Sequence, residues 1–293
     1  MEIRILRYFL AVAKEGTISG AAELMNVTQP TLSRQLMELE DELGKKLFIR
    51  GNRKITLTEE GHYLRKRAEE IIELADKTKL DIQTSDEVIT GDIFIGSGET
   101  DAMRTIAKTI KDMNAAYPQV KYHIFSGNAD DVTEKLDRGL IDFGLLIEPV
   151  DKEKYAYLRL PVADAWGLLM RKDSPYAKLD HITPKDIANM PLLCSRQTMV
   201  KDEITNWFGK SFDELNVIST YNLLYNASLM VEEEVGYAIC LDRLVNTTGK
   251  SKLCFRPLYP KLECGLVIVW KKDQIFSRAC ELFLNMLRDK YLT

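Results

Sequence analysis

The fold of the N-terminal region is decided by the stretch Val27-Thr28-Gln29-Pro30-Thr31-Leu32-Ser33-Arg34-Gln35. Thr28 is a favourable helix N-cap, and Pro30 falls in the first turn, where no backbone N–H is needed. Four leucines then lie on a narrow arc of the helical wheel, and we expect this side to pack inward: Leu32, Leu36, Leu39 and Leu43. The other side carries Pro30, Arg34 and Met37, flanked by Thr31 and Ser33. The stretch predicts an amphipathic helix with a polar, exposed N-terminal end.

This exposed end has the side chains that read base edges in DNA. Arg34 can donate two hydrogen bonds to guanine, Gln29 can pair with adenine, and the methyl group of Thr31 can contact thymine. The pattern favours a recognition helix that enters the major groove. Winged helices also serve as protein-binding modules, and periodicity alone leaves that alternative open.

Two shorter helices are predicted before the recognition helix. Apolar residues at i, i+3, i+4 and i+7 indicate a first helix that ends near Gly16: Leu6, Phe9, Leu10 and Ala13. Ser19 is the expected N-cap of a second helix, in which Ala21 and Ala22 would let a neighbouring helix approach closely. Residues 26–27 form the predicted turn into the third helix.

A basic wing is predicted after Gly44. Residues 47–50 and 55–57 read as two short strands, joined by the basic turn 51–54. From Gly44 to Arg67 there are eight Lys or Arg and two Glu, a local net charge of +6, although the whole chain has a net charge of −4. Three cations of the wing are expected to contact phosphates or the minor groove and to add salt-dependent affinity: Arg50, Arg53 and Lys54.

The run of residues in this region resembles the DNA-binding region of the LysR-type transcriptional regulators of bacteria. The matching positions are Ala21-Ala22, Leu24, Val27 to Gln35, Leu39-Glu40, Leu43-Gly44, Leu47-Phe48, Arg50, Arg53, Leu57-Thr58 and Gly61. The resemblance implies that Arg50 and Arg53 serve the wing and that five residues face the DNA: Gln29, Pro30, Thr31, Ser33 and Arg34. It also implies binding to double-stranded promoter DNA as a homodimer or homotetramer, a small-molecule effector, and RNA polymerase as a possible further partner.

A long helix is predicted from the N-cap Thr58 to about Thr84. Its apolar residues alternate in spacing between four and three and form a heptad seam: Leu64, Ala68, Ile71, Ala75, Thr78 and Ile82. The seam can pack on the core of its own chain or pair with its copy in a dimer. The resemblance favours the dimer, because this family uses the linker helix for dimerisation.

The remainder of the chain has the rhythm of an open α/β sheet. Strands at 93–95, 120–125 and 143–147 alternate with helices at 103–113 and 130–138, which predicts a parallel sheet. A second lobe has expected strands near 167–170, 191–194, 217–220 and 237–240 and helices near 199–207 and 223–233. The strand 266–269 and the helix 276–290 are expected to rejoin the first lobe.

We therefore predict an α/β multidomain protein. Residues 1–58 form a winged helix-turn-helix domain, 59–88 a linker and dimerisation helix, and 89–293 an effector-binding domain. The effector-binding domain is predicted to have two lobes like a periplasmic binding protein, with lobe I at about 91–161 and 267–293 and lobe II at about 162–266.

Ligands of open α/β sheets bind at the carboxyl ends of the strands. The polar or loop residues expected there are Ser97, Gly98, Glu99, Thr100, Ser126, Gly127, Asn128, Ile147, Trp166, Ser195, Arg196 and Asn222. For each polar residue taken alone, a turn or cap role is an open alternative. Glu99 departs from relatives with a neutral residue at this place, so an anionic effector is not expected unless Arg196 compensates. We hypothesise an effector with an amine or several hydroxyl groups.

Other classes of protein have little support. The sequence has no P-loop, no G-x-S-x-G and no H-E-x-x-H, so we expect no enzymatic activity, metal or cofactor. A solute-binding transport protein would lack the DNA-reading region. The longest uncharged apolar run, 264–270, is too short to span a bilayer, and we expect a cytoplasmic protein.

The five cysteines are read as buried, reduced thiols, since none forms a C-x-x-C pair. A redox switch that uses Cys254 and Cys264 is the alternative.

Overall fold

The computed structural model of the chain describes residues 1–51, 54–82, 89–195, 202–209 and 214–291. The chain divides into two compact units, Met1–Gln83 and Thr84–Thr293. Each unit has its own core of buried hydrophobic residues.

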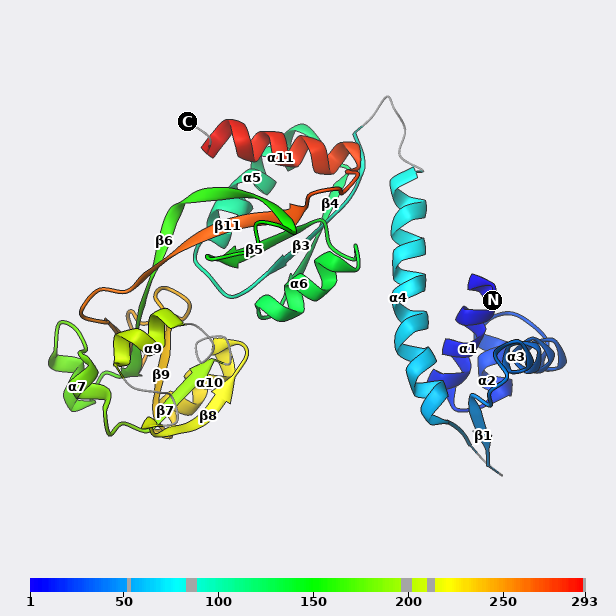
Figure 1. The fold of residues 1–293 in the computed structure, drawn as a ribbon, viewed down its shortest axis with the longest axis horizontal. Helices are drawn as coiled ribbons and strands as arrows, with labels where there is room; N and C mark the ends of the chain where they lie inside the picture. The colour runs from blue at the N-terminus through cyan, green and yellow to red at the C-terminus, as the bar shows by residue number, and fades with distance from the viewer. Residues whose placement is uncertain (52–53, 83–88, 196–201, 210–213, 292–293) are drawn as a thin grey trace. The chain divides into compact units, whose positions relative to one another are not determined.

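The first unit is a three-helix domain with a two-stranded wing and a long C-terminal helix (Figure 1). Its elements are α1 (Ile3–Glu15), α2 (Ile18–Leu24), α3 (Gln29–Leu43), β1 (Phe48–Arg50), β2 (Ile55–Leu57) and α4 (Glu59–Ile82). The three helices, the wing and the start of α4 enclose one core, which includes Leu6, Phe9, Leu32, Leu36, Leu39 and Leu47. The predicted elements of this region are confirmed.

The helix ends follow the local sequence with one exception. α1 ends at Gly16, whose φ of 69° is left-handed and suits glycine. The Thr28 side chain caps α3 by accepting a hydrogen bond from the Thr31 N–H, as predicted. The prediction that Ser19 caps α2 was wrong. The cap is Thr17, whose extended backbone lets its hydroxyl accept the Gly20 N–H, whereas Ser19 lies inside the helix.

The inward face of α3 also differs from the prediction at its last turn. Leu32, Leu36 and Leu39 are buried as expected, but Leu43 is 41% exposed, and Glu40 is buried instead at 5%. The chain reverses at Gly44, and the Glu40 carboxylate accepts backbone N–H groups from the segment that returns. Hydrogen bonding therefore outweighs the hydrophobic pattern at this turn.

The apolar seam of α4 divides into two parts. Leu64 and Ala68 are buried in the core of the first unit, which is the alternative in which the helix packs on its own chain. Ile71 is 38% exposed and Ile82 is 78% exposed. The second half of the seam thus forms a shallow apolar groove, which we call the α4 groove: Ile71, Leu74, Ala75, Thr78, Lys79 and Ile82.

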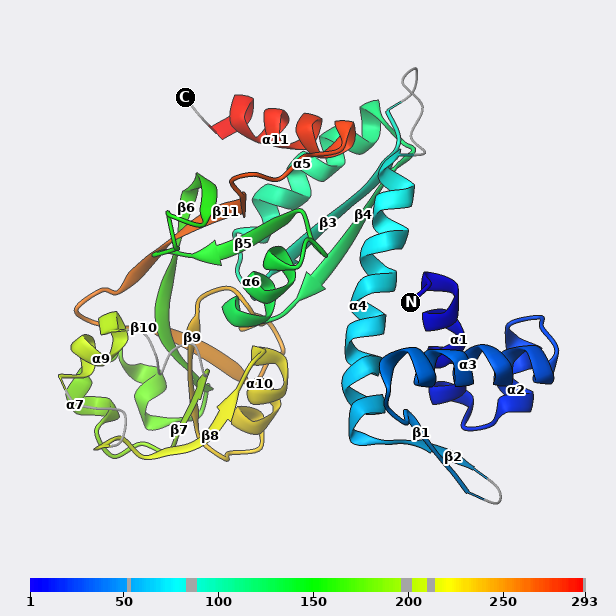
Figure 2. The ribbon, with the colours of Figure 1, turned by 45° about the vertical axis from the view of Figure 1, so that its right-hand side comes forward.

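Lobe I of the second unit is a sheet covered by helices on both faces (Figures 1 and 2). Its elements are β3 (Gly91–Ser97), α5 (Met103–Ala116), β4 (Val120–Ser126), α6 (Ala129–Asp137), β5 (Phe143–Ile147) and the C-terminal α11 (Arg278–Tyr291). β3 is parallel to β4 and to β5. Side chains alternate along β3, so that Ile93 and Ile95 join the core with α5 and α11, whereas Phe94 packs on the α6 side.

Lobe II has its own parallel strands and helices. These are β7 (Leu192–Ser195), β8 (Val217–Tyr221), β9 (Tyr237–Leu241), the 3-10 helix η1 (Pro175–Lys178), α7 (Pro184–Ile187), α9 (Asp202–Phe208) and α10 (Leu224–Glu232). β7 is parallel to β8 and β9. Leu224, Ala227 and Val231 of α10 pack against one face of this sheet.

Two antiparallel strands join the lobes. β6 (Tyr155–Arg171) and β11 (Glu263–Lys271) pair over most of the length of β11, and β10 (Leu253–Pro257) pairs with the end of β6. In the described part of the chain the strand order is β4-β3-β5-β11-β6-β9-β7-β8, with β10 beside β6. The parallel pairing predicted for the strands at 93–95, 120–125 and 143–147 is confirmed, whereas β6, β10 and β11 pair antiparallel with their neighbours, and β10 was not predicted.

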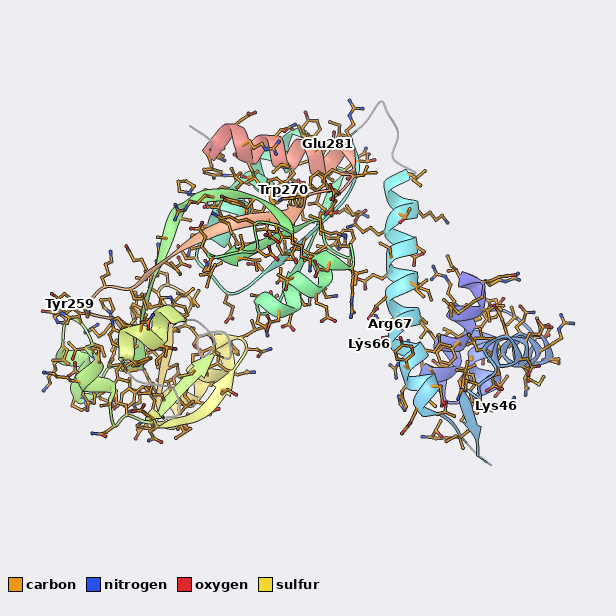
Figure 3. The ribbon with its side chains drawn as sticks, viewed as in Figure 1. Lys46, Lys66, Arg67, Tyr259, Trp270 and Glu281 are labelled. Atoms are coloured by element: carbon orange, nitrogen blue, oxygen red, sulfur yellow. The ribbon has the colours of Figure 1, made fainter. Side chains whose placement is uncertain are left out.

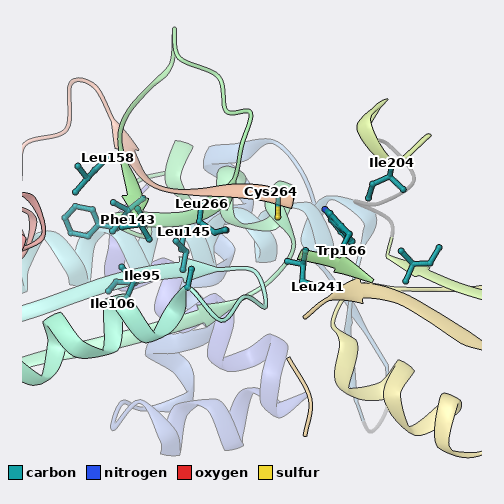
Figure 4. Packing of buried hydrophobic residues seen from close by; sticks show 14 of the residues in the cluster. Ile95, Ile106, Phe143, Leu145, Leu158, Trp166, Ile204, Leu241, Cys264 and Leu266 are labelled. Carbon is teal, nitrogen blue, oxygen red and sulfur yellow. The ribbon is translucent and has the colours of Figure 1, made fainter. Parts of the chain in front are cut away.

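A single hydrophobic core continues from lobe I into lobe II. Figure 4 shows Ile95, Phe143 and Leu145 in line with Leu266 and, further along, with Trp166 and Leu241. Because β6 and β11 are continuous through this core, the lobes are joined by two strands and the packing around them.

Candidate DNA-binding surface and effector cleft

The N-terminal end of α3 presents the predicted polar side chains to solvent. Gln29, Pro30, Thr31 and Arg34 are exposed, and Ser33 is half-buried. The hydroxyls of Thr28 and Thr31 are 2.8 Å apart, so the cap also fixes the Thr31 side chain. The first two turns of α3 thus form an exposed strip whose backbone is rigidly attached to the core through Leu32 and Leu36.

Arg34 is held next to an acidic residue of its own helix. Its side chain is 70% exposed, and Nε lies 3.7 Å from Oε1 of Glu38 one turn later. The Gln35 amide also donates to the Glu38 carboxylate, at 2.7 Å. An exposed i,i+4 ion pair stabilises a protein by about 0.5 kcal/mol or less, so the guanidinium can exchange Glu38 for a base at little cost.

The wing lies directly after α3 in the chain and carries basic residues. β1 and β2 pair in the register Phe48↔Leu57, Ile49↔Thr56 and Arg50↔Ile55. Lys54 is exposed at the end of the wing, whereas Arg53 and the side chain of Arg50 lie outside the described part of the structure. Figure 3 shows Lys46 beside the wing and Lys66 and Arg67 on α4.

Glu40 connects the recognition helix to the wing, a role that the sequence did not predict. Its Oε1 accepts the Leu47 N–H at 2.8 Å and the Phe48 N–H at 3.3 Å, and its Oε2 accepts the Lys46 ammonium at 2.9 Å. Burial by itself raises the pKa of Glu40, but these hydrogen bonds outweigh burial and hold the pKa below its ordinary value of 4.5. The ionised carboxylate fixes the start of β1 against α3.

The second candidate site is a partly open cleft of about 60 Å³ between the lobes. Nine of the predicted effector-site residues line it: Gly98, Glu99, Thr100, Gly127, Asn128, Ile147, Trp166, Ser195 and Asn222. Ser97 and Ser126 line a neighbouring surface hollow with Asp101, Arg104 and Arg243. Arg196 lies outside the described residues.

Several polar groups around the cleft are already engaged in hydrogen bonds. The Thr100 hydroxyl donates to Asp164, and the Asn128 side chain caps α6 by accepting the Asp131 N–H at 2.9 Å. The Asn222 side chain accepts the Leu223 N–H at 2.9 Å. The Glu99 carboxylate accepts the N–H of Leu224, the first residue of α10. For Thr100 and Asn128 the structural role that the sequence left open is therefore present.

Asp164 is the most buried acid at the junction of the lobes, with 1% exposure. Burial raises its pKa, and the nearby Asp242 and Asp101 raise it further, whereas the Thr100 hydrogen bond and Arg243 lower it. Arg243 lies 3.1 Å from Asp164, 3.3 Å from Asp101 and 2.9 Å from Asp242. Arg243 therefore contacts three carboxylates at this position, of which Asp101 also pairs with Arg104 at 2.7 Å.

The apolar part of the cleft was not predicted. It includes Tyr221, Leu224, Cys240, Leu241 and Leu244. The Tyr221 hydroxyl donates to the Ile239 carbonyl at 2.5 Å, and burial raises the pKa of this phenol well above its ordinary value. These residues lie at the ends of strands and the start of a helix, where the hydrophobic pattern indicates core, so the sequence alone gives no signal that they face a ligand.

The five cysteines are buried thiols, as predicted. Burial raises the pKa of the Cys194 thiol to about 12 and also raises that of Cys254. A thiol with a raised pKa has little thiolate and reacts slowly, which disfavours the redox alternative for Cys254.

The residues that the structure describes hold no group of three or more His, Cys, Asp or Glu side chains arranged to bind a metal ion. No helix among them is both long enough and apolar enough to cross a membrane.

Comparisons with known proteins agree for both units. Residues 3–62 match the family model described as bacterial regulatory helix-turn-helix protein, lysR family, and residues 86–292 match the LysR substrate binding domain. The transcriptional regulator BsdA of Bacillus subtilis is 31% identical over 218 residues, which are 74% of each chain. The uncharacterized regulator YvbU of the same organism is 25% identical over 294 residues, 99% of each chain.

A crystal structure of full-length CbnR complexed with its target DNA has the same fold, with a TM-score of 0.78, 19% identity and 99% of each chain covered. The family model of the LysR substrate binding domain alone spans more than half of the chain, so membership of the LysR family does not depend on the helix-turn-helix match. The chain belongs to the LysR family of bacterial transcriptional regulators.

Proposed function

We propose that this LysR-family regulator reads its operator through the first two turns of α3 and holds the DNA backbone with its wing. The observation that carries the proposal is the exposed strip of Gln29, Pro30, Thr31 and Arg34 on a helix whose other side is buried. Ser33 lies at the margin of the strip. Lys54 and the two other predicted wing cations, Arg50 and Arg53, add affinity that is independent of sequence.

The protein acts as an oligomer, and the α4 groove is one of its subunit contacts. Ile71, Leu74 and Ile82 are exposed on a helix whose first half is already packed. A second copy of the groove would bury these side chains in a two-fold contact and would supply the second DNA-reading domain. The groove is short and contains Ala and Thr, so further contacts must contribute, and a homodimer or a homotetramer both fit.

The cleft between the lobes binds the small-molecule effector. Its apolar wall and few polar groups are features of small-ligand sites. The effector acts by binding one arrangement of the subunits better than another. The bound regulator functions in the cytoplasm at promoter DNA, where RNA polymerase is a further partner, and it carries out no reaction of its own.

Selection of fragmented genomic DNA by the purified protein, followed by sequencing, tests the proposal. The wild-type chain is expected to enrich fragments that share an interrupted inverted repeat. The Arg34→Ala chain is expected to retain DNA without enriching that repeat, because it keeps the phosphate contacts. Enrichment of the same repeat by Arg34→Ala would contradict the assignment of α3.

A further inference from the structure

The most informative contact outside the DNA-binding unit joins the two lobes across the cleft. Glu99 follows β3 in lobe I, and its carboxylate accepts the backbone N–H of Leu224 in lobe II, 125 residues later in the sequence. Both residues line the cleft. The contact therefore places a carboxylate of the protein at the N-terminus of α10, inside the proposed effector site.

The N-terminus of α10 offers a place for an anion that the local sequence does not fill. The cap residue Leu223 has no polar side chain, and the first turn, Leu224 to Asn226, contains no acidic residue. The unpaired N–H groups and the dipole of a helix favour negative charge at this end. Glu99 supplies that charge from the opposite lobe.

Positive charge to balance a second anion is absent from the described lining of the cleft. The residues that line it include Glu99 but no Lys, Arg or His among those that the structure describes. The nearby Arg243 is shared by Asp101, Asp164 and Asp242. The phenol of Tyr221 stays neutral and donates to a backbone carbonyl. A carboxylate ligand would therefore meet Glu99 directly, with its natural position at α10 already occupied.

We infer that Glu99 is the specificity determinant of this cleft: it occupies the anion position at α10, excludes carboxylate ligands and selects ligands that bring a cation or several hydrogen-bond donors. The inference rests on the proposed function, in which the cleft binds the effector. When the Glu99 carboxylate and a ligand carboxylate lie about 4 Å apart in a partly screened environment, their repulsion weakens binding by on the order of 100-fold or more.

A matched pair of probes separates charge from shape. Benzoate and benzamidine are both flat and Y-shaped, but the first is an anion and the second a cation. We would measure their dissociation constants by isothermal titration calorimetry on the full chain at fixed ionic strength, and follow Trp166 fluorescence to place the probe in the cleft. The wild type should bind benzamidine at least about tenfold more tightly than benzoate, because only benzamidine can pair with Glu99.

Two variants test Glu99 itself, and a third serves as a control. Glu99→Ser opens the anion position and should reverse the preference in favour of benzoate. Glu99→Gln keeps an acceptor for the Leu224 N–H and the fold, so it should lose the repulsion and bind benzoate at an intermediate level. Asp130→Ser removes one exposed acid from the first turn of α6, outside the cleft lining, and should keep the wild-type preference.

The results separate the two levels of the proposal. Equal binding of benzoate by the wild type and Glu99→Ser, or a preference that Glu99→Ser leaves unchanged, would overturn the role of Glu99 and leave the cleft as a ligand site. If neither benzoate nor benzamidine binds to the wild type or to any of the three variants, the proposed effector cleft is overturned, and the inference with it.

Discussion

Glu40 gives the sharpest prediction about how the DNA-binding unit is held together. Its carboxylate accepts the Leu47 N–H at 2.8 Å and the Phe48 N–H at 3.3 Å, in a region where the side chain is 5% exposed. Glu40→Ala leaves two backbone donors without an acceptor, at a cost of about 1 to 3 kcal/mol for each buried donor. The salt bridge to Lys46 adds little, because the Lys46 side chain is 70% exposed.

We therefore expect Glu40→Ala to destabilise the first unit by about 3 kcal/mol. Glu40→Gln keeps one acceptor oxygen but loses the charge, and should cost about half as much. Asp41→Ala, which removes an exposed acid from the next position of α3, should cost less than about 0.5 kcal/mol. All three variants lie in α3 and remove one negative charge, so the comparison among them isolates the buried contacts of Glu40.

The effect should depend on pH with a definite sign. The folded-state pKa of Glu40 lies below the ordinary value of 4.5, so the ionised carboxylate stabilises the fold above that pH. This contribution is lost as the pH falls through the folded-state pKa, where the carboxyl group becomes protonated in both states. The difference in stability between the wild type and Glu40→Gln should shrink below pH 4.5.

Hydrogen exchange of the full chain, read by mass spectrometry on peptides that cover residues 45–58, measures this unit separately from the second one. Glu40→Ala should lose protection at the start of β1 by about two orders of magnitude, which corresponds to about 3 kcal/mol. Protection equal to that of Asp41→Ala would refute the reasoning, since the buried hydrogen bonds would then contribute nothing.

Three further predictions concern other parts of the chain. Lys54→Ala should weaken binding to all duplexes about equally and reduce the slope of log affinity against log salt by about one, as measured by fluorescence anisotropy; a loss confined to the operator would contradict its backbone role. Leu74→Asp in the α4 groove should lower the mass of the oligomer in analytical ultracentrifugation, whereas the control Glu73→Asp should not. An unchanged mass for Leu74→Asp would show that the groove is not a subunit contact. Arg243→Ala leaves the buried Asp164 beside two other acids. Calorimetry should show that the free energy of unfolding of the second unit falls by about 2 kcal/mol at neutral pH and by less at acidic pH, where Asp164 is protonated. A loss that does not change with pH would argue against this charge balance.

The sequence predicted the first unit well because its signals are local. Caps at Thr28 and Thr58, the glycine at 16 and the spacing of Leu32, Leu36 and Leu39 each act within a few residues. The failure at Leu43 has a different origin, because Glu40 gains its partners only when the chain returns at Leu47 and Phe48. Periodicity carries no information about such a contact.

The second unit was harder to predict for the same physical reason. β6 runs continuously through both lobes, and only its last residues, near 167–170, read as a strand in the sequence. The partner of Glu99 lies 125 residues away, so the sequence could mark Glu99 as unusual but could not place it at the N-terminus of α10. The apolar lining of the cleft likewise cannot be told from core by pattern.

We propose that Arg34 on α3 reads a guanine in the operator. The most direct test measures the affinity of the wild type and of Arg34→Ala for two duplexes. The first duplex is the selected operator. The second has 7-deazaguanine, which lacks the N7 acceptor, at the candidate guanine positions. We expect the wild type to lose about 10- to 100-fold in affinity on the modified duplex, whereas Arg34→Ala should bind both duplexes equally. An equal loss for both proteins would contradict it.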